Sequence, residues 1–346
     1  MKECYLYQKS GDYVVCQTCN HRCRIAPYKR GLCGVRENQQ GKLYLLVYGR
    51  IITENIDPIE KKPLYHFMPG TTSLSIATVG CNFRCLWCQN WDIAQCTKGN
   101  IDRDEITNRM GVEMTPEQVV EDAQKNGCPS VSYTYTEPTI FLEFALDAMK
   151  LAQKAGLKNV WVSNGYMTKE TLDLITPYLD AINVDLKGFS QENYLKYSGA
   201  KLQPILDNIK EISKRKIHLE VTTLIVPGVN DDKKQLTSIA KFLAGISKNI
   251  PWHISRFFPA YKMADTPITP IETIHLAESL GKKAGLKFVH LGNVSDPKKE
   301  STYCPKCGEL IILRNGYEIQ IKKLKVKDKK GYCQKCKEDL NITTLR

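Results

Sequence analysis

Three cysteines in the first third of the chain carry the strongest chemical signal in the sequence. Cys81, Cys85 and Cys88 are separated by three and then two residues. Thiolates this close together can each ligate one iron of a 4Fe-4S cubane. The fourth iron then lacks a ligand from this loop and can chelate a small molecule through nitrogen and oxygen. Phe83 and Trp87 stand between the cysteines and would keep water away from such a cluster.

Two other interpretations of this group stay open. The three cysteines could bind zinc with a distant fourth ligand, or they could be buried core residues without a ligand. Their position favours the cluster, because Cys81 follows directly after Gly80, at the end of an expected strand. In barrels of alternating strands and helices, the chemistry lies at the carboxyl ends of the strands.

A second cysteine group lies near the C-terminus. It consists of two Cys-x2-Cys pairs separated by 25 residues, Cys304 with Cys307 and Cys333 with Cys336. Between the pairs, apolar strands are expected on either side of Asn315-Gly316, a strong hairpin signal. Two such pairs and a hairpin predict a zinc ribbon whose metal stabilises a module too small for a large core. The alternative is four unligated cysteines.

The third group precedes the others and is harder to interpret. Cys16, Cys19, Cys23 and Cys33 are enough for one closed site, but their spacing suits neither zinc nor a ferredoxin-type cluster well. Zinc is the favoured interpretation, and a second iron-sulfur cluster is the alternative. His21 could replace one cysteine, although a polar surface histidine is the simpler expectation.

Composition indicates a protein of the reducing cytoplasm. The 346 residues include 14 cysteines without an export signal, which argues for metal ligation and against disulfides. No apolar run is long enough to span a membrane. The net charge of +12 comes from the two ends, because residues 46–297 contain 28 basic and 28 acidic residues. We therefore expect three parts: a Cys-rich metal module over 1–45, a large domain over 46–297 and a zinc-ribbon module over 298–346.

The central part alternates between strand and helix patterns. Strands are expected at 73–80, 130–135, 160–164, 181–186, 218–226, 252–258 and 287–292. Helices are expected from Thr115, where Thr, Pro and Gln form a start signal, and at about 140–155, 168–178, 203–215, 231–246 and 270–284. Repeated units of this kind predict an α/β fold with a parallel sheet, as a partial (β/α)6 TIM-type barrel. A doubly wound open sheet is the alternative.

The cysteine loop resembles that of the radical S-adenosylmethionine (SAM) superfamily, with its Cys-x3-Cys-x2-Cys spacing and an aromatic residue before the last cysteine. The resemblance implies a 4Fe-4S cluster on Cys81, Cys85 and Cys88, whose open iron binds the amino and carboxylate groups of SAM. In that superfamily the reduced cluster cleaves SAM to methionine and a 5'-deoxyadenosyl radical, which abstracts hydrogen from a substrate. No catalytic residue beyond the cluster and SAM is implied.

Later motifs resemble relatives of the pyruvate formate-lyase activating enzyme and imply a SAM site. The segment 133–138 ends in Glu-Pro, as in the Gly-Gly-Glu-Pro of these relatives, with Tyr135 and Thr136 in place of the glycines. Glu137 would accept a hydrogen bond from the methionyl ammonium, or would only start a helix. Further segments resemble Thr-Asn-Gly and Asp-Leu-Lys motifs. The implied SAM-site residues are Trp87, Tyr135, Thr136, Glu137, Ser163, Asn164, Asp185 and Lys187.

Two of these residues have a more specific implied role. Asp185 and Lys187 alternate to one face of a strand, and the resemblance assigns Lys187 to the methionyl carboxylate and Asp185 to the ribose side. Without the resemblance, the pair could be a capped strand end and a solvated charge.

A narrower resemblance covers nearly the whole chain and is carried by the cysteines from 16 to 33, residues 60–67, residues 133–138 and the C-terminal cysteine pairs. These segments resemble the radical enzyme of the AmmeMemoRadiSam system. That family name records an association with Memo and AMMECR proteins, which implies them as partners. Lys61, Lys62 and His66 could reach the substrate, although surface lysines and a half-buried histidine are the simpler expectation. The activase-like motifs imply an oxidoreductase that receives electrons from a ferredoxin or flavodoxin and acts on a macromolecule, with protein favoured over RNA.

Other functions stay open at this stage. Within the enzyme class, RNA or a small molecule could be the substrate. In a different class, the chain could be an iron-sulfur and zinc protein for redox or nucleic-acid binding, with basic termini on phosphates. The lysine-rich stretch 321–330 contains few aromatic residues for base stacking, so a solvated face is the simpler interpretation.

Overall fold

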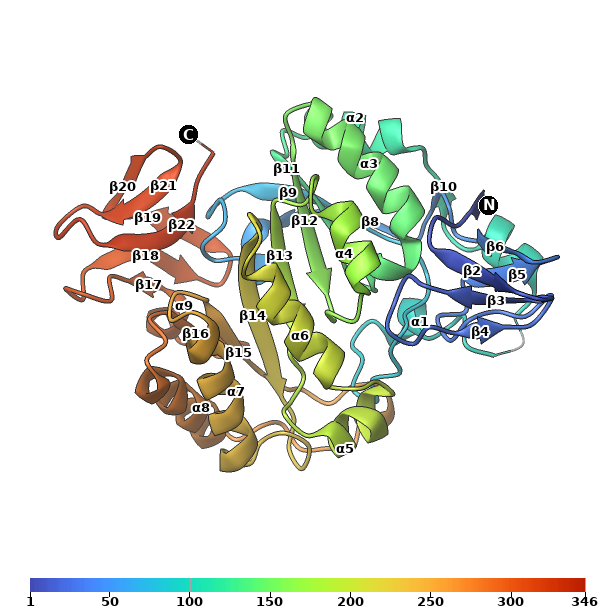
Figure 1. The fold of residues 1–346 in the computed structure, drawn as a ribbon. Helices are drawn as coiled ribbons and strands as arrows, with labels where there is room; N and C mark the ends of the chain where they lie inside the picture. The colour runs from blue at the N-terminus through green and yellow to red at the C-terminus, as the bar shows by residue number, and fades with distance from the viewer. Residues whose placement is uncertain (100, 346) are drawn as a thin grey trace.

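The computed structural model describes residues 1–99 and 101–345, and its largest element is an eight-stranded sheet (Figure 1). Its strands are β8 (Thr53–Pro58), β9 (Thr72–Ala77), β11 (Ser130–Tyr133), β12 (Lys158–Ser163), β13 (Ala181–Asp185), β14 (His218–Ile225), β15 (Trp252–Arg256) and β16 (Val289–Gly292). From β9 to β16 the strands are parallel and neighbours in chain order, whereas β8 pairs antiparallel with β9. The predicted parallel α/β sheet is confirmed.

The strand order also bears on the alternative topology. A doubly wound sheet reverses its order at a switch point, and no such reversal occurs within the described residues. Because crossovers between parallel strands are right-handed, a sheet in simple chain order has its helices on one face. The edge strands β8 and β16 do not pair with each other in the part of the chain that the structure describes.

The helices connect successive strands. They are α1 (Trp91–Ala94), α2 (Pro116–Lys125), α3 (Leu142–Lys154), α4 (Lys169–Ile175), α5 (Gln191–Asn193), α6 (Gln203–Ile212), α7 (Lys233–Ile246), α8 (Ile271–Ala284) and α9 (Pro297–Glu300), with short 3-10 or π turns η1 (Ile59–Lys61), η2 (Glu105–Arg109), η3 (Pro138–Phe141), η4 (Tyr194–Ser198) and η5 (Tyr261–Met263). The start signal before α2 forms the predicted capping box, in which Thr115 and Gln118 exchange hydrogen bonds. No helix among the described residues has the length and apolar character to cross a bilayer.

Two of the strands that end earlier than expected, β9 and β11, lead into the candidate site. β9 stops at Ala77 and not at residue 80, because Gly80 has a φ of 97°. β11 stops at Tyr133, because Tyr135 has a φ of 60°. Both values lie in the left-handed region, which an extended strand cannot include.

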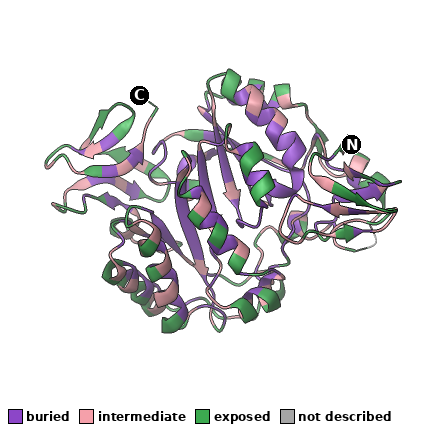
Figure 2. Cartoon of the chain, viewed as in Figure 1, coloured by how far each residue is buried: buried purple, intermediate pink, exposed green. Residues whose placement is uncertain are grey.

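The N-terminal segment consists of short strands that pack on the central sheet. These are β1 (Lys2–Glu3), β2 (Tyr7–Ser10), β3 (Tyr13–Cys16), β4 (Arg24–Ile25), β5 (Arg36–Gln39), β6 (Lys42–Leu45) and β7 (Arg50–Ile51), the last paired with β10 (Val112–Glu113). Apolar side chains of this segment, including Val14, Val35 and Leu43, belong to the same hydrophobic cluster as the central strands. The purple strands in Figure 2 show how fully the central sheet is buried.

The C-terminal segment forms two three-stranded sheets with a small core of their own. The strands are β17 (Thr302–Tyr303), β18 (Leu310–Asn315), β19 (Glu318–Ile321), β20 (Leu324–Lys327), β21 (Lys330–Cys333) and β22 (Asp339–Thr343). The predicted hairpin exists, but Asn315 pairs with Glu318, so the two-residue loop is Gly316-Tyr317 and not Asn-Gly. Gly316 supplies the positive φ of 60° that such a loop requires at its first position.

The C-terminal segment contacts the amino-terminal side of the central sheet. The backbone N–H of Thr343 donates to the carbonyl of His66, and Met68 donates to the carbonyl of Thr343, just before β9 begins. Arg314, fully buried, donates to the carbonyl of Tyr65 at 2.7 Å. The segment therefore lies at the end of the sheet opposite to the carboxyl ends of its strands.

Candidate active site

The cysteine loop, residues 81–88, begins just beyond the carboxyl end of β9 and lies against the N-terminal segment. A Cβ atom at Gly80 would come within 2.8 Å of Val35 and 2.9 Å of the Cys33 carbonyl oxygen. Only glycine fits this close approach with a positive φ. The sharp turn at residue 80 thus directs the loop across the end of the sheet.

The three cysteines of the loop are free thiols with little exposure. Cys85 is buried, whereas Cys81 and Cys88 are half-buried. The sulfur of Cys85 lies 3.6 Å from Ser198 Oγ, and the backbone N–H of Phe83 donates to the sulfur of Cys81 at 3.4 Å. Burial raises the pKa of the Cys81 thiol well above its usual range and that of Cys88 to about 11. A cationic metal centre would offset this cost and hold the sulfurs as thiolates.

Aromatic side chains cover the loop. Phe83 and Trp87 are both buried. The ring of Phe83 lies 5.3 Å from that of Tyr166, and the ring of Trp87 lies 6.2 Å from that of Tyr197. Water is therefore restricted around the cysteines, as the sequence predicted.

Glu137 lies beyond the end of β11 and is the most heavily hydrogen-bonded acid of the site. Its Oε1 accepts from the backbone N–H and the hydroxyl of Thr139 and from the Ser163 hydroxyl at 2.8 Å. Its Oε2 accepts from the backbone N–H of Asn164 at 2.8 Å. Burial nevertheless raises the pKa of this carboxyl, although the hydrogen bonds oppose the rise. Glu137 thus does start a helical turn, η3, and also joins the ends of β11 and β12.

Asn164 connects this carboxylate to the cysteine loop. Its side-chain amide donates to Asn82 Oδ1 at 2.7 Å, and its own Oδ1 accepts from the backbone of Tyr166. Asn82 is buried and directly follows Cys81. The ends of β9, β11 and β12 are therefore joined by one hydrogen-bonded chain from Asn82 through Asn164 to Glu137.

Asp185 and Lys187 form an ion pair at the end of β13. Lys187 Nζ lies 2.8 Å from Asp185 Oδ2. Burial alone would lower the pKa of Lys187, but the negative charges of Asp185 and Cys85 raise it above its usual range. Asn230, in the loop after β14, donates to the Lys187 carbonyl at 2.9 Å and fixes its backbone. The pair lies near Cys85, as expected for residues at neighbouring strand ends.

Comparison with known proteins decides the family. A sequence profile described as the radical SAM superfamily matches residues 75–238, which contain the cysteine loop and the ends of β9 to β14. The chain is also 44% identical over 344 residues, 99% of either chain, to the uncharacterized protein MJ0808 of Methanocaldococcus jannaschii. The chain belongs to the radical SAM superfamily.

More distant relatives carry informative names. A putative glycyl-radical enzyme activating enzyme of M. jannaschii is 25% identical over 188 residues, 53% of this chain and 67% of that protein. The pyruvate formate-lyase-activating enzyme of Staphylococcus epidermidis is 24% identical over 190 residues, 51% and 72% of the two chains. Among solved structures, a domain of such an enzyme from Bacteroides vulgatus has 19% identity and a TM-score of 0.43, covering 47% of this chain and 99% of that chain.

The site fits the 4Fe-4S cluster and SAM that membership in the radical SAM superfamily implies. Three free thiols are gathered in a water-poor loop. Within the described residues, Glu137 Oε2 accepts one hydrogen bond and Lys187 Nζ donates one, to Asp185. A carboxylate oxygen can accept a second bond and an ammonium can donate two more. Both groups therefore keep capacity for a ligand with an ammonium and a carboxylate.

Tyr135 and Thr136 replace the glycines of the activase-like motif, and the backbone shows the consequence. Tyr135 has the left-handed φ of 60° that glycine adopts without cost, and its carbonyl accepts from Asn90 at 2.7 Å. Its hydroxyl reaches Asp57, and Thr136 donates to the carbonyl of Thr78 at 2.9 Å. The glycine-type conformation is thus retained and held by side-chain contacts.

The expectation that Lys62 is a surface lysine and His66 a half-buried histidine was wrong. Lys62 is 1% exposed and donates to Asp57 at 2.5 Å, so it is an interior residue. Burial lowers the pKa of this amine to about 8. His66 is fully buried and lies against the C-terminal segment. Only Lys61 is a partly exposed lysine of the expected kind, paired with Asp57 at 2.8 Å.

Sequence reasoning missed the polar residues that fix the site. Asn82 and Ser198 contact the cysteine loop, and Asn230 fixes Lys187. Asn82 stands between two cysteines, where a residue without a thiol gives no signal by its spacing. Asn230 lies in the loop after β14, and its contact with Lys187, just beyond β13, could only be found in three dimensions.

The four C-terminal cysteines form a compact group. All their sulfur atoms lie within 4.8 Å of one another, with 3.4 Å between Cys304 and Cys336 and 3.7 Å between Cys307 and Cys333. A tetrahedral zinc ion with bonds of about 2.3 Å separates its thiolates by about 3.8 Å. The predicted four-ligand metal site is therefore geometrically sound.

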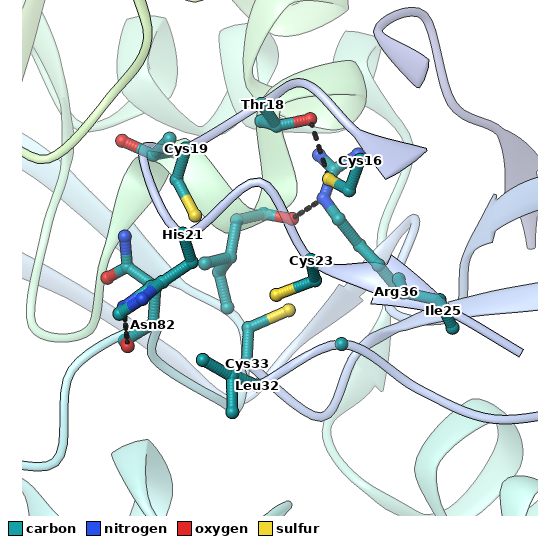
Figure 3. Close-up of a pocket in the computed structure, with 13 residues that line it drawn as sticks. Cys16, Thr18, Cys19, His21, Cys23, Ile25, Leu32, Cys33, Arg36 and Asn82 are labelled. Carbon is teal, nitrogen blue, oxygen red and sulfur yellow. Dashed lines mark hydrogen bonds between the residues drawn. The ribbon is translucent and has the colours of Figure 1, made fainter. Parts of the chain in front are cut away.

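The four N-terminal cysteines line a single cavity (Figure 3). His21 also lines it, but its Nε2 donates to the carbonyl of Asn82 at 2.9 Å, so that nitrogen is already in use. His21 is half-buried and lies 4.8 Å from the Tyr166 ring, which differs from the surface position expected for it.

Proposed function

We propose that this radical SAM enzyme abstracts a hydrogen atom from a macromolecule, with a protein residue favoured, in the manner of a glycyl-radical activase. The observation that carries the proposal is the cysteine loop at the end of β9, joined through Asn82 and Asn164 to Glu137. The names of the distant relatives support a protein substrate, because they are activating enzymes.

Each polar residue of the site has a proposed role. Cys81, Cys85 and Cys88 hold the cluster, which together with SAM supplies a radical that abstracts hydrogen. Glu137 accepts a hydrogen bond from the ammonium of the cofactor, and Lys187 donates to its carboxylate. Ser163 and Asn164 orient Glu137, whereas Asp185 orients Lys187 from the ribose side. Trp87 excludes water, while Tyr135 and Thr136 set the backbone beside the cofactor.

We also propose a zinc ion on Cys304, Cys307, Cys333 and Cys336, on the basis of their sulfur distances. Its role is structural, because this segment is attached to the amino-terminal side of the sheet, away from the cysteine loop. Membership in the AmmeMemoRadiSam system, with Memo and AMMECR proteins as partners, is part of the same proposal and rests on the sequence resemblance.

A basic hollow beside the cysteine loop supports a macromolecular partner. Arg84, Lys98, Lys196 and Lys262 line it, and no acidic side chain does among the described residues. Such a concentration of positive charge attracts an acidic protein surface and accelerates its association. A ferredoxin or flavodoxin as electron donor, or the substrate itself, suits this hollow.

Hydrogen transfer into 5'-deoxyadenosine tests the substrate class. The enzyme, reduced under anaerobic conditions, is incubated with SAM and with the protein, the RNA or the small-molecule fraction of an extract of its own cells grown in deuterated medium, and the 5'-deoxyadenosine formed is examined by mass spectrometry. We expect deuterium in 5'-deoxyadenosine with the protein fraction, and the Cys85→Ala variant should abolish it. The Cys96→Ala variant is the matched control, because Cys96 is a lone cysteine close to the loop. Deuterium transferred only from the RNA fraction or the small-molecule fraction would contradict the protein proposal.

A further inference from the structure

We infer that Asp57, on the edge strand β8, is a positioning residue of the SAM site. Its carboxylate holds Tyr135 in a left-handed conformation, and Tyr135 in turn holds the exit of the cysteine loop and the turn that carries Glu137. Within the described residues Asp57 makes no hydrogen bond to the cysteine loop, so it acts through Tyr135. The effect on SAM rests on the role proposed above for Glu137, whereas the effect on the loop rests on hydrogen bonds of the protein alone.

Tyr135 needs an anchor because its backbone conformation is unfavourable for a residue with a side chain. Its φ of 60° lies in the left-handed region, where the β-carbon comes too close to the following carbonyl oxygen. Such a conformation costs free energy and persists only where the surrounding contacts fix it. The turn is tight, because the backbone N–H of Thr136 donates to the carbonyl of Thr134 at 2.7 Å. Glu137 follows directly after Thr136, so its position depends on this turn.

Asp57 provides the anchor for the hydroxyl of Tyr135. The carboxylate is 4% exposed, and its Oδ2 accepts from the Tyr135 hydroxyl. Lys61 donates to Oδ1 at 2.8 Å, and Lys62 donates to Oδ2 at 2.5 Å. Burial alone would raise the pKa of Asp57, but these three hydrogen bonds lower it below the usual range of an aspartate. The hydroxyl of Tyr135 therefore meets a charged acceptor, and charge-assisted hydrogen bonds are the strong ones.

The two lysines also contact the ring of Tyr135. The Nζ of Lys62 lies 4.6 Å from the ring centre, and the Nζ of Lys61 lies 5.9 Å from it. A cation at such a distance from the face of an aromatic ring is attracted to it. Because Lys62 is only 1% exposed, water weakens this attraction little. The hydroxyl and the ring of Tyr135 are thus held by the same three residues, which fixes its side chain in one position.

Tyr135 transmits this position to the cysteine loop through Asn90. The side-chain amide of Asn90 donates to the carbonyl of Tyr135 at 2.7 Å, and Asn90 lies two residues after Cys88. Helix α1 begins directly after Asn90, and the carbonyl of Ile93 in this helix accepts from the backbone N–H of Gly80, just before the loop. Both ends of the loop are therefore tied to Tyr135, and Asp57 is the residue that holds Tyr135.

Two substitutions of Tyr135 separate a positioning role from direct contact between its ring and SAM. Tyr135→Phe removes the hydroxyl and keeps the ring, whereas Tyr135→Gly removes the side chain but allows the left-handed φ without strain. In the iron-loaded protein we expect Tyr135→Phe and Asp57→Asn each to weaken equilibrium SAM binding about tenfold. Tyr135→Gly should weaken it less than Tyr135→Phe does. Wild-type affinity in Tyr135→Phe, or weaker binding by Tyr135→Gly than by Tyr135→Phe, would overturn the inference.

The combination of Asp57→Asn with Tyr135→Gly tests whether Asp57 acts through Tyr135. Because no phenol is left to hold, Asp57→Asn should change the SAM affinity of Tyr135→Gly by no more than about twofold, and a larger further loss would contradict the inference. Asp147→Asn is the matched control, because Asp147 in α3 also accepts from a lysine and a tyrosine, Lys2 at 2.5 Å and Tyr48 at 2.6 Å. Equal weakening of SAM binding by Asp147→Asn and Asp57→Asn would show a general loss of stability in place of a positioning role.

Amide hydrogen exchange separates this inference from the proposed function. In the iron-loaded protein without SAM, we expect residues 88–95 to exchange about tenfold faster in Tyr135→Phe than in the wild-type protein, and at the wild-type rate in Asp147→Asn. Mass spectrometry measures this, and wild-type exchange in Tyr135→Phe would overturn the inference. A wild-type protein that contains its cluster but binds no SAM would contradict the proposed function, whereas faster exchange in Tyr135→Phe would still support the positioning of the loop by Tyr135.

Discussion

The Nε2 of His21 lies 2.9 Å from the carbonyl oxygen of Asn82 and joins the N-terminal segment to the cysteine loop. The same asparagine accepts from Asn164 through its side chain. The loop is therefore held from two sides, by the segment before the central sheet and by the end of β12. Radical chemistry requires a fixed distance between the radical and its target, and these two hydrogen bonds fix the loop that would carry the cluster.

Glu137→Gln should weaken SAM binding while the iron content stays unchanged. The substitution removes the charge from a charge-assisted hydrogen bond to the cofactor ammonium, worth roughly 1.5–3 kcal/mol, so affinity should fall about tenfold or more. Equilibrium binding of SAM to the anaerobic enzyme measures this. Equal affinity in the variant would mean that Glu137 has only a structural role, as the N-terminal cap of η3.

Arg314→Ala should destabilise the protein by about 3–5 kcal/mol, the usual cost of leaving a buried charge without its partner. Arg314 is fully buried, donates to the Tyr65 carbonyl and lies 3.8 Å from the carboxylate of Glu60. Denaturant unfolding of the metal-loaded protein gives the free energy of unfolding. Lys322→Ala, at an exposed position of the same segment, should leave it within about 0.5 kcal/mol. A similar small effect for both variants would mean that Arg314 does not fasten the C-terminal segment.

Stability should fall on acidification below about pH 6.5, because two buried histidines resist protonation. Burial lowers the pKa of His66 to about 3, and it lowers that of His290 well below its usual value. The unfolded chain binds protons at about pH 6.5, so each histidine costs up to about 1.4 kcal/mol of stability per pH unit between the two pKa values. The stabilisation is fully present above pH 6.5.

The groups around these histidines do not reverse the predicted loss of stability on acidification. Glu220 accepts from His218 and His253, and its pKa is lowered despite burial, so it also favours the folded state above the acidic range. Denaturant unfolding between pH 5 and 8 measures the slope. The His275→Ala variant, at an exposed position, should not alter this slope. A free energy of unfolding that does not change with pH would contradict the claim that the buried histidines are neutral.

Reversing the charge of two side chains in the basic hollow should slow the reduction of the enzyme's cluster by a protein donor. It should leave the reduction of the cluster by dithionite unchanged. Lys196→Glu with Lys262→Glu places two acids in a hollow otherwise lined by cations, which reduces the association rate of an acidic donor about tenfold or more at low salt. Stopped-flow reduction measures it. The matched control, Lys325→Glu with Lys327→Glu, changes the same charge on the distant C-terminal segment. Equal slowing by both pairs would show that the hollow has no special part in docking.

The sequence could predict those features of the fold that depend on the local pattern of apolar residues and turn residues. The strands β13 and β14 fall within one residue of the expected bounds, because apolar runs between turn signals define them. The positions of Glu137 and Lys187 at strand ends followed from the same pattern. The C-terminal hairpin was displaced by one residue, because both Asn315 and Gly316 accept turn conformations and only pairing across β18 and β19 decides the register.

Burial and partners could not be predicted in this way. Lys62 adjoins the exposed-looking Lys61 in the sequence, yet its amine enters the interior to pair with Asp57, a contact set by the path of β8. The spacing of the N-terminal cysteines could not decide between zinc and a second iron-sulfur cluster. The cavity between them is also lined by Asn82 of the cysteine loop and by Thr139 and Ile140 of η3, which are distant in sequence from the four cysteines.

Formation of 5'-deoxyadenosine tests the central claim most directly. The enzyme is reconstituted with iron and sulfide without oxygen, reduced with dithionite and incubated with SAM, and the products are separated by chromatography. We predict 5'-deoxyadenosine from the wild-type protein and from Cys96→Ala, and none from Cys81→Ala, Cys85→Ala or Cys88→Ala. Absence of 5'-deoxyadenosine from a wild-type protein that spectroscopically contains its 4Fe-4S cluster would contradict the account.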